Sequence, residues 1–165
     1  MEINDNQRQQ IRRFVLIPPL NFNAIQAVTN GGPCANWVRG VIESATGCQI
    51  QNSSHVFAEN INCINQGIII PDIKTFQELV NDGDILYVVN ISTGNTTHYM
   101  LKCDVEIDGI RCSCLGINGG LNLDSVDYHG VLASRITEDC FAQDGSFIYD
   151  RLSGKHLLYL VAYEL

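Results

Sequence analysis

Two alternating segments joined by Asp108-Gly109 constrain the fold of this sequence more than any other feature. Apolar and polar residues alternate from 98 to 107, and an apolar segment follows at 110–117. Alternation with a period of two is typical of a β-strand, and Asp-Gly favours a two-residue hairpin turn. We therefore predict an antiparallel hairpin in which Ile107 lies opposite Ile110.

This register pairs apolar residues with apolar residues and opposite charges with each other: Val105 with Cys112, Cys103 with Cys114, and Glu106 with Arg111. The three cysteines are expected on the apolar side of the hairpin. Continued to the end of the hairpin, the register places Gly119 opposite His98. A β-bulge in the first strand would bring Asn118 there instead, and a bulge in the second, for which Gly116 is a candidate, would bring Gly120.

A helix is predicted to begin near Cys34 and to end at Gly47, with Pro33 in its first turn. Its apolar residues recur at helical spacing: Ala35, Val38, Val41, Ile42 and Ala45. A shorter helix is expected from Asp72 or Thr75 to Val80, and residues 48–66 are expected to form loops.

Strands are predicted at 85–91, 146–149 and 156–163, in addition to the hairpin. One main helix followed by antiparallel strands indicates an α+β fold. The length of 165 residues indicates a single domain over 1–165, in which 1–13 are polar and expected to form a flexible lead-in.

The composition excludes several classes of protein. Hydrophobic residues make up 45% of the chain and charged residues 17%, which suits a packed core. The net charge of −8 argues against binding to nucleic acids or anionic membranes, because both attract Lys- and Arg-rich surfaces. No segment is long enough to span a membrane, and the polar N-terminus is no secretory signal, so we expect synthesis in the cytoplasm. The seven cysteines follow no CxxC spacing and indicate no zinc ribbon or complete disulfide framework; we predict no metal or cofactor.

Cys34 and His98 are the candidates for chemistry. Cys34 follows Gly31-Gly32-Pro33 at the start of a helix, where the partial positive charge and the free N–H groups stabilise a thiolate. Among the four histidines, His98 begins a strand after a polar loop, which suits a general base reaching into a cleft. A buried structural cysteine and an ordinary strand-edge histidine are the simpler interpretations of the two residues.

A resemblance to the NlpC/P60 and CHAP amidases supports the catalytic interpretation of both residues. The nucleophile helix of these enzymes resembles the segment Cys34-Ala-Asn-Trp-Val-Arg-Gly-Val-Ile-Glu-Ser-Ala-Thr-Gly. Their leucine, Gly-Asp and apolar strand resemble Phe76-Gln-Glu-Leu-Val-Asn-Asp-Gly-Asp-Ile-Leu-Tyr-Val-Val, and their histidine strand resembles His98-Tyr-Met-Leu. The resemblance covers 33–47 and 76–118, roughly a third of the chain.

The resemblance implies a papain-like fold, with the nucleophile helix packed on an antiparallel sheet, and a Cys–His thiol hydrolase. Cys34 would attack an amide carbonyl and His98 would transfer the protons. Asn118 is our first choice for the residue that orients the imidazole, with Asp124 and Asp104 as alternatives.

The group that binds the oxyanion in such an enzyme is less well marked in the sequence. Papain relatives have a Gln several residues before the cysteine; Gln26 and Asn30 are candidates here, although neither spacing matches well. Trp37 is expected in the core or in the wall of the cleft.

The candidate residues and the resemblance leave three alternative functions open. The first is an amidase or endopeptidase acting on peptidoglycan stem peptides, such as an antibacterial toxin exported by a specialised secretion system and inhibited by an immunity protein. The second is a cysteine protease, deubiquitinase or glutamine deamidase acting on a host protein, since Gly-Pro-Cys also resembles some deubiquitinases. The third is a non-enzymatic α+β interaction domain in which Cys34 and His98 lie far apart.

Overall fold

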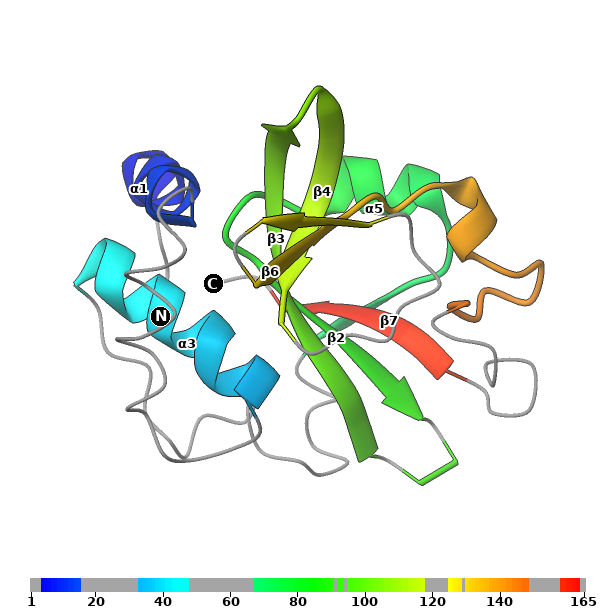
Figure 1. The fold of residues 1–165 in the computed structure, drawn as a ribbon. Coiled ribbons are helices and arrows are strands. Elements are labelled where there is room, and N and C mark those ends of the chain that lie inside the picture. The colour runs from blue at the N-terminus through cyan, green and yellow to red at the C-terminus, as the bar shows by residue number, and fades with distance from the viewer. Residues whose placement is uncertain are drawn as a thin grey trace.

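The fold was described from a computed structural model that covers residues 4–15, 33–47, 67–90, 92–93, 95–117, 125–128, 130–148 and 158–163. These residues form an α+β fold built on a curled, seven-stranded sheet (Figure 1). The strands are β1 (Ile68–Ile70), β2 (Ile85–Asn90), β3 (Asn95–Ile107), β4 (Ile110–Gly116), β5 (Ser125–Tyr128), β6 (Val131–Ser134) and β7 (Leu158–Tyr163). Their order is β1-β7-β2-β3-β4-β6-β5, and every neighbouring pair is antiparallel.

The predicted strand over 85–91, the hairpin, and the last strand are confirmed as β2, β3–β4 and β7. The strand expected at 146–149 is wrong for the described residues 146–148, where Phe147 makes only an isolated bridge with Phe141. The hairpin of β5 and β6 was not predicted. Each of its strands has four residues, too few for alternation to be a clear signal.

The turn and the first part of the β3–β4 register are as predicted. Asp108 and Gly109 have φ angles of 54° and 78°, the left-handed backbone that a two-residue hairpin turn requires. The three pairs beside the turn are Ile107 with Ile110, Glu106 with Arg111 and Val105 with Cys112.

The register then shifts by one residue between Lys102 and Val105, with the extra residue on β3. This is the bulge in the first strand that the sequence left open as an alternative. Beyond this irregularity Cys114 pairs with Lys102, so the predicted pairing of Cys103 with Cys114 is wrong. Because directly opposite residues share a face, the shift also separates the cysteines. Cys103 and Cys112 belong to one core cluster and Cys114 to the other.

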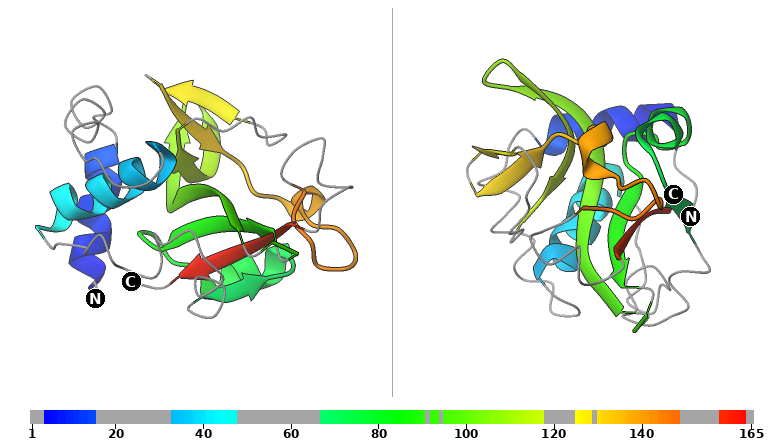
Figure 2. Two further views of the ribbon diagram at one scale, coloured as in Figure 1. Left: turned by 90° about the horizontal axis from the view of Figure 1, so that it is seen from below. Right: turned by 90° about the vertical axis from the view of Figure 1, so that its right-hand side faces the viewer.

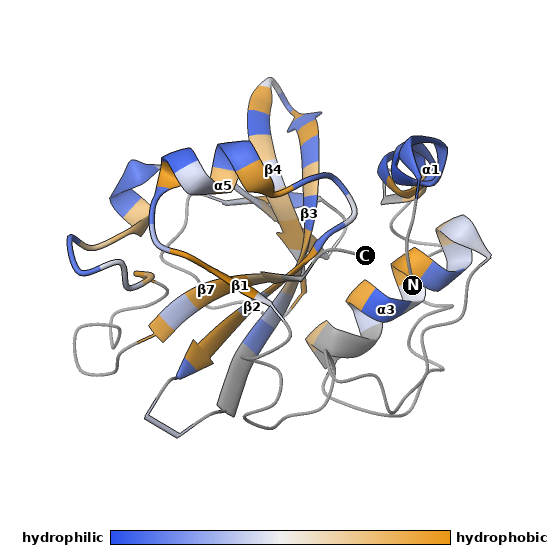
Figure 3. Cartoon of the chain, turned by 180° about the vertical axis from the view of Figure 1, so that it is seen from behind, coloured by the Kyte–Doolittle hydropathy of each residue, from blue (hydrophilic) through white to orange (hydrophobic). Residues whose placement is uncertain are grey.

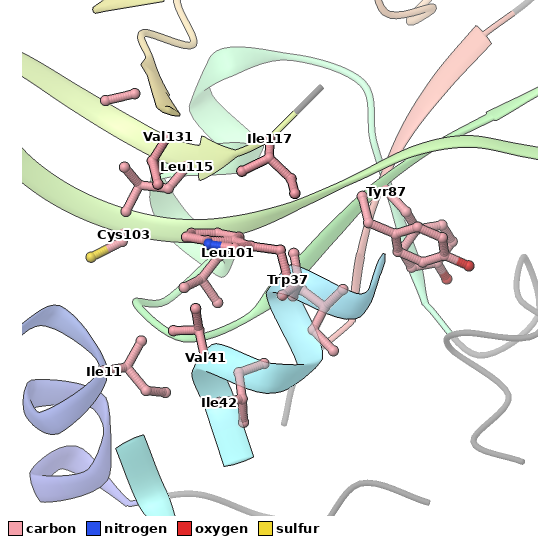
Figure 4. Close-up of a cluster of buried hydrophobic side chains, with 14 of the residues drawn as sticks. Ile11, Trp37, Val41, Ile42, Tyr87, Leu101, Cys103, Leu115, Ile117 and Val131 are labelled. Carbon is pink, nitrogen blue, oxygen red and sulfur yellow. The ribbon is translucent and has the colours of Figure 1, made fainter. Parts of the chain in front are cut away.

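The sheet has a buried cluster on each face, because β2 and β3 contribute alternate side chains to both. Tyr87, Tyr99 and Leu101 pack on one face with helices α1 (Asp5–Val15) and α3 (Pro33–Thr46), and we call this the α3 face (Figures 1 and 4). Leu86 and Met100 pack on the other with helix α5 (Ile73–Leu79), the α5 face. The alternation is visible as bands along β3 and β4 in Figure 3.

Helix α3 matches its prediction closely. It begins at Pro33, and its residues in the α3-face cluster are Trp37, Val38, Val41 and Ile42. It ends where Gly47 takes a φ of 73° and donates a backbone hydrogen bond to Glu43. Helix α5 is also confirmed: the Asp72 carboxylate caps it by accepting a hydrogen bond from the Thr75 N–H at 2.7 Å.

The polar start of the chain contains a helix where a flexible lead-in was expected. Helix α1 lies beside α3 (Figure 2), and its Ile11 is fully buried in the α3-face cluster. Phe14, three residues after Ile11, packs against the same cluster. Because the predicted lead-in ended at residue 13, it separated Ile11 from Phe14 and Val15, which follow it at helical spacing. A short 3₁₀-helix, η1 (Glu138–Cys140), follows β6. No helix within the described ranges is both long and apolar enough to cross a membrane.

Candidate functional site

Cys34 lies in the first turn of α3 and is partly exposed. It packs at the margin of the α3-face cluster. The other cysteines within the described residues are all buried: Cys103, Cys112, Cys114 and Cys140. Burial raises the pKa of Cys103 and of Cys114 to about 12, which keeps both as thiols at neutral pH. Cys34 is therefore the most accessible thiol in the part of the chain that the structure describes.

His98 lies on the central strand β3, where only 3% of it is exposed. It pairs directly with Val88 of β2, a member of the α5-face cluster. A methyl group in place of the Gly116 hydrogen on β4 would lie 3.4 Å from the His98 Nε2 atom and 3.4 Å from the Met100 Cγ atom. The imidazole therefore points to the α5 face, beside Met100.

Loss of solvent lowers the pKa of His98 to about 4. The imidazole is consequently neutral across the physiological range. Neutrality is a requirement for a general base, but the same burial removes the side chain from an open cleft.

The structure does not bring Cys34 and His98 together. Cys34 packs against the cluster on the α3 face, whereas His98 points to the α5 face. The reason is the period of two in β3: Tyr99, the neighbour of His98, is the residue that points to the α3 face. The predicted arrangement, in which His98 reaches into a cleft beside Cys34, is corrected by this geometry.

Of the remaining candidates, Trp37 and Asp104 are among the described residues. Trp37 is 1% exposed and belongs to the core, not to the wall of a cleft (Figure 4). Asp104 is exposed, and its carboxylate accepts a hydrogen bond from the Lys102 ammonium at 2.9 Å. Several residues that the sequence singled out lie outside the described residues: Gln26, Asn30, His55, Asn118, Asp124, His129 and His156.

A network of charges that sequence reasoning missed surrounds the Gly-Asp segment. The buried Asp84 carboxylate accepts hydrogen bonds from the Asn81 N–H at 2.8 Å and from the Arg8 guanidinium of α1 at 3.0 Å. Asp82 binds Arg12 of α1 at 3.4 Å and Lys102 of β3 at 3.0 Å. Gly-Asp thus has a structural role here, since it ties the turn before β2 to α1. The spacing of Arg8 and Arg12, one helical turn apart, was the available signal.

Lys102 is buried but paired. Desolvation opposes its charge, and the hydrogen bonds to Asp104 and Asp82 outweigh that effect, so the pKa of Lys102 is raised. The ammonium also lies 5.8 Å from the centre of the Phe76 ring. The lysine is therefore charged, and its ammonium contacts the Phe76 ring of α5 and the carboxylates of Asp82 and Asp104.

Beside Lys102 lies a groove of about 570 Å³ between α5, β3, β4 and the segment that follows β6. One wall is apolar and comes largely from α5, with Ile73, Phe76 and Val80. Arg111 of β4 and Arg135 also line the groove. Cys34 is not among the residues that line this groove.

Within the described residues no cluster of His, Cys, Asp and Glu has an arrangement that would hold a metal ion. The chain matches no known protein family model, no curated protein and no solved structure.

Proposed function

We propose that the chain is a cysteine hydrolase that cleaves amide bonds with Cys34 as its nucleophile. The observation that supports this is the position of Cys34: it lies in the first turn of a 14-residue helix and is partly exposed, while the other described thiols are buried. A helix N-terminus stabilises a thiolate, and its free N–H groups can stabilise the oxyanion that forms during acyl transfer. The ordered resemblance to the NlpC/P60 and CHAP amidases supports the same role.

The proposed reaction has two steps. The Cys34 thiolate forms a bond to the carbonyl carbon, the C–N bond breaks, and the amine leaves with a proton from a protonated histidine. Water then attacks the thioester, the histidine takes up its proton, and the carboxylic acid and the thiolate are released.

The resemblance favours peptidoglycan stem peptides as the substrate. A toxin that cuts them would require export from the producing cell and an immunity protein that blocks the cleft. A protease, deubiquitinase or deamidase acting on a host protein would use the same chemistry on a different amide.

His98 points to the α5 face, away from the cluster on which Cys34 packs. We therefore propose that the base serving Cys34 is one of the other three histidines, His55, His129 and His156. Each histidine can be tested separately.

Alkylation of the folded protein by iodoacetamide at pH 7, followed by mass spectrometry of the peptides, tests the nucleophile. We expect Cys34 to react at least tenfold faster than any other thiol. Replacing the catalytic histidine by Ala should lower the rate at which Cys34 is alkylated, and replacing any of the other three histidines should leave that rate unchanged.

The activity of a Cys34 variant gives a second test. Cys34→Ala should abolish release of stem peptides from peptidoglycan fragments without lowering the Tm, and Cys140→Ala is the control that should keep the activity. If Cys34 reacts no faster than the buried thiols, the enzyme proposal fails.

A non-enzymatic α+β interaction domain is the second candidate, and one observation favours it. Cys34 and His98 are on opposite faces of the sheet, as this alternative predicts. Ordinary reactivity of Cys34, unchanged by all four histidine variants, would support this candidate. Hydrolysis of ubiquitin conjugates, without release of stem peptides, would support the host-protein substrate.

A further inference from the structure

The groove between α5 and β4 combines an apolar wall with two arginines that have no acidic partner among the described residues. Arg111 and Arg135 are both exposed, both line the groove, and neither makes an ion pair with a described residue. Two such arginines that line one groove suggest that an acidic group from outside binds there.

Arg111 gives the clearest indication. Glu106 lies directly opposite it on β3, and a pair in that position usually attracts. The two side chains nevertheless form no ion pair, and Arg111 lines the groove instead. The guanidinium is thus available to a ligand even though a carboxylate of the chain is within reach.

The other charges of the groove leave an excess of positive charge. Lys102 and Asp104 neutralise each other across 2.9 Å. Glu138 is the remaining carboxylate among the residues that line the groove, against the two arginines Arg111 and Arg135. The Ser113 hydroxyl accepts a hydrogen bond from the Ile136 N–H at 3.0 Å, which orients it and keeps its own proton for donation.

The apolar wall defines the rest of the ligand. Phe76 and Val80 are buried, while Ile73 is partly exposed and lines the groove with Ile136. A volume of about 570 Å³ accommodates a few residues of an extended chain. Carboxylates on one side and apolar side chains on the other would match both walls.

We infer that this groove binds an acidic peptide segment in which carboxylate and apolar side chains alternate, with Arg111 and Arg135 holding the carboxylates. Bidentate binding of a carboxylate by a guanidinium gives both affinity and orientation. The inference stands apart from the proposed hydrolase, because the groove is built on the α5 side of the sheet and Cys34 packs on the α3 side.

Fluorescence anisotropy with the full chain tests this inference. The probe is a labelled eight-residue peptide of alternating Glu and Leu, compared with the same peptide carrying Gln in place of Glu. We expect the Glu peptide to bind at least tenfold more tightly and to weaken as NaCl is raised from 50 to 500 mM. Arg111→Gln and Arg135→Gln should each weaken binding about fivefold or more.

Arg13→Gln is the matched control, because it removes the same charge from an exposed position on α1, away from the groove. It should change the affinity less than twofold. Equal binding of the two peptides, or equal losses in all three variants, would overturn the inference. Tighter binding of a single-stranded oligonucleotide than of the Glu peptide would also overturn it. Because both arginines are exposed, Arg111→Gln and Arg135→Gln should lose affinity for the Glu peptide without a change in Tm. Ile73→Gln alters the apolar wall and gives a second test, in which the affinity for the Glu peptide should also fall.

Discussion

At the scale of single residues, the burial of His98 has a consequence that does not depend on catalysis. The neutral imidazole is packed beside Met100 and close to Gly116, and its pKa is lowered to about 4 by the loss of solvent. In the unfolded chain the pKa of a histidine is about 6.5. Between these values the unfolded chain binds a proton that the folded chain does not bind, so acid favours unfolding.

We therefore predict that His98 contributes to the acid lability of the protein. Its contribution to the free energy of unfolding is complete above about pH 6.5 and is lost as the pH falls from there to about 4. The full difference is on the order of 3 kcal/mol. Urea unfolding at several pH values between 4 and 7.5 should show a steeper loss for the wild type than for His98→Gln. Parallel curves for the two proteins would contradict the buried, neutral histidine.

Cys34 and His98 also show what the sequence could and could not reveal about the site. The position of Cys34 in the first turn of α3 followed from Pro33, the helical spacing and Gly47, all of which are local signals. The direction of His98 depends on which face of β3 the helix covers. The alternation places His98 on the more polar face of β3, but this face is exposed only at Asp104 and Glu106 and is buried at 98–103. The burial of His98 therefore depends on the elements that pack over this part of the sheet, which the alternation does not reveal.

At the scale of elements, α1 is held to the domain by apolar contacts of Ile11 and Phe14 and by two ion pairs, one nearly buried and one exposed. Ile11 is fully buried against the α3-face cluster. The Arg8–Asp84 pair is nearly excluded from solvent, with 13% and 2% of the side chains exposed, whereas Arg12 of the Arg12–Asp82 pair is 40% exposed. Breaking a buried pair leaves a charge without compensation, while an exposed pair is screened by water.

The two arginines, one helical turn apart on α1, make a matched comparison. Arg8→Met should lower the free energy of unfolding by about 2–3 kcal/mol, because the buried Asp84 carboxylate loses its cation. Arg12→Met should cost less than about 1 kcal/mol. Urea denaturation of both variants at pH 7 measures the difference. Equal costs would indicate that Asp84 is stabilised by its other contacts and not by α1.

The β3–β4 hairpin shows which features of an element the sequence pattern predicts and which it does not. Asp108-Gly109 determined the turn and the pairing next to it, because a two-residue turn allows one register. The sequence leaves a bulge in either strand open, and only the structure places it between Lys102 and Val105 on β3, since a bulge depends on how the sheet curls and on what packs against it. Strands β5 and β6 were missed for a different reason, because four residues are too few to show a clear alternation.

At the scale of the whole molecule, the two core clusters share their central strands. Tyr87 and Leu101 pack on the α3 face, and their neighbours Leu86 and Met100 pack on the α5 face. Neither cluster can lose its β2 and β3 residues without disturbing the other. The described structure should therefore unfold as one cooperative unit, as expected of a single domain of this size.

Trp37, the only tryptophan in the chain, allows this cooperativity to be measured. It is buried in the α3-face cluster, so its fluorescence reports the unfolding of that cluster, whereas far-UV circular dichroism reports the whole sheet.

Leu160→Ala removes a fully buried side chain from the α5-face cluster and should lower the free energy of unfolding by about 3 kcal/mol. In this variant the fluorescence and dichroism midpoints in urea should fall together, although Trp37 is on the opposite face. If the dichroism midpoint falls while the fluorescence midpoint stays at the wild-type value, the two faces unfold separately. The argument that β2 and β3 join them into one unit is then wrong.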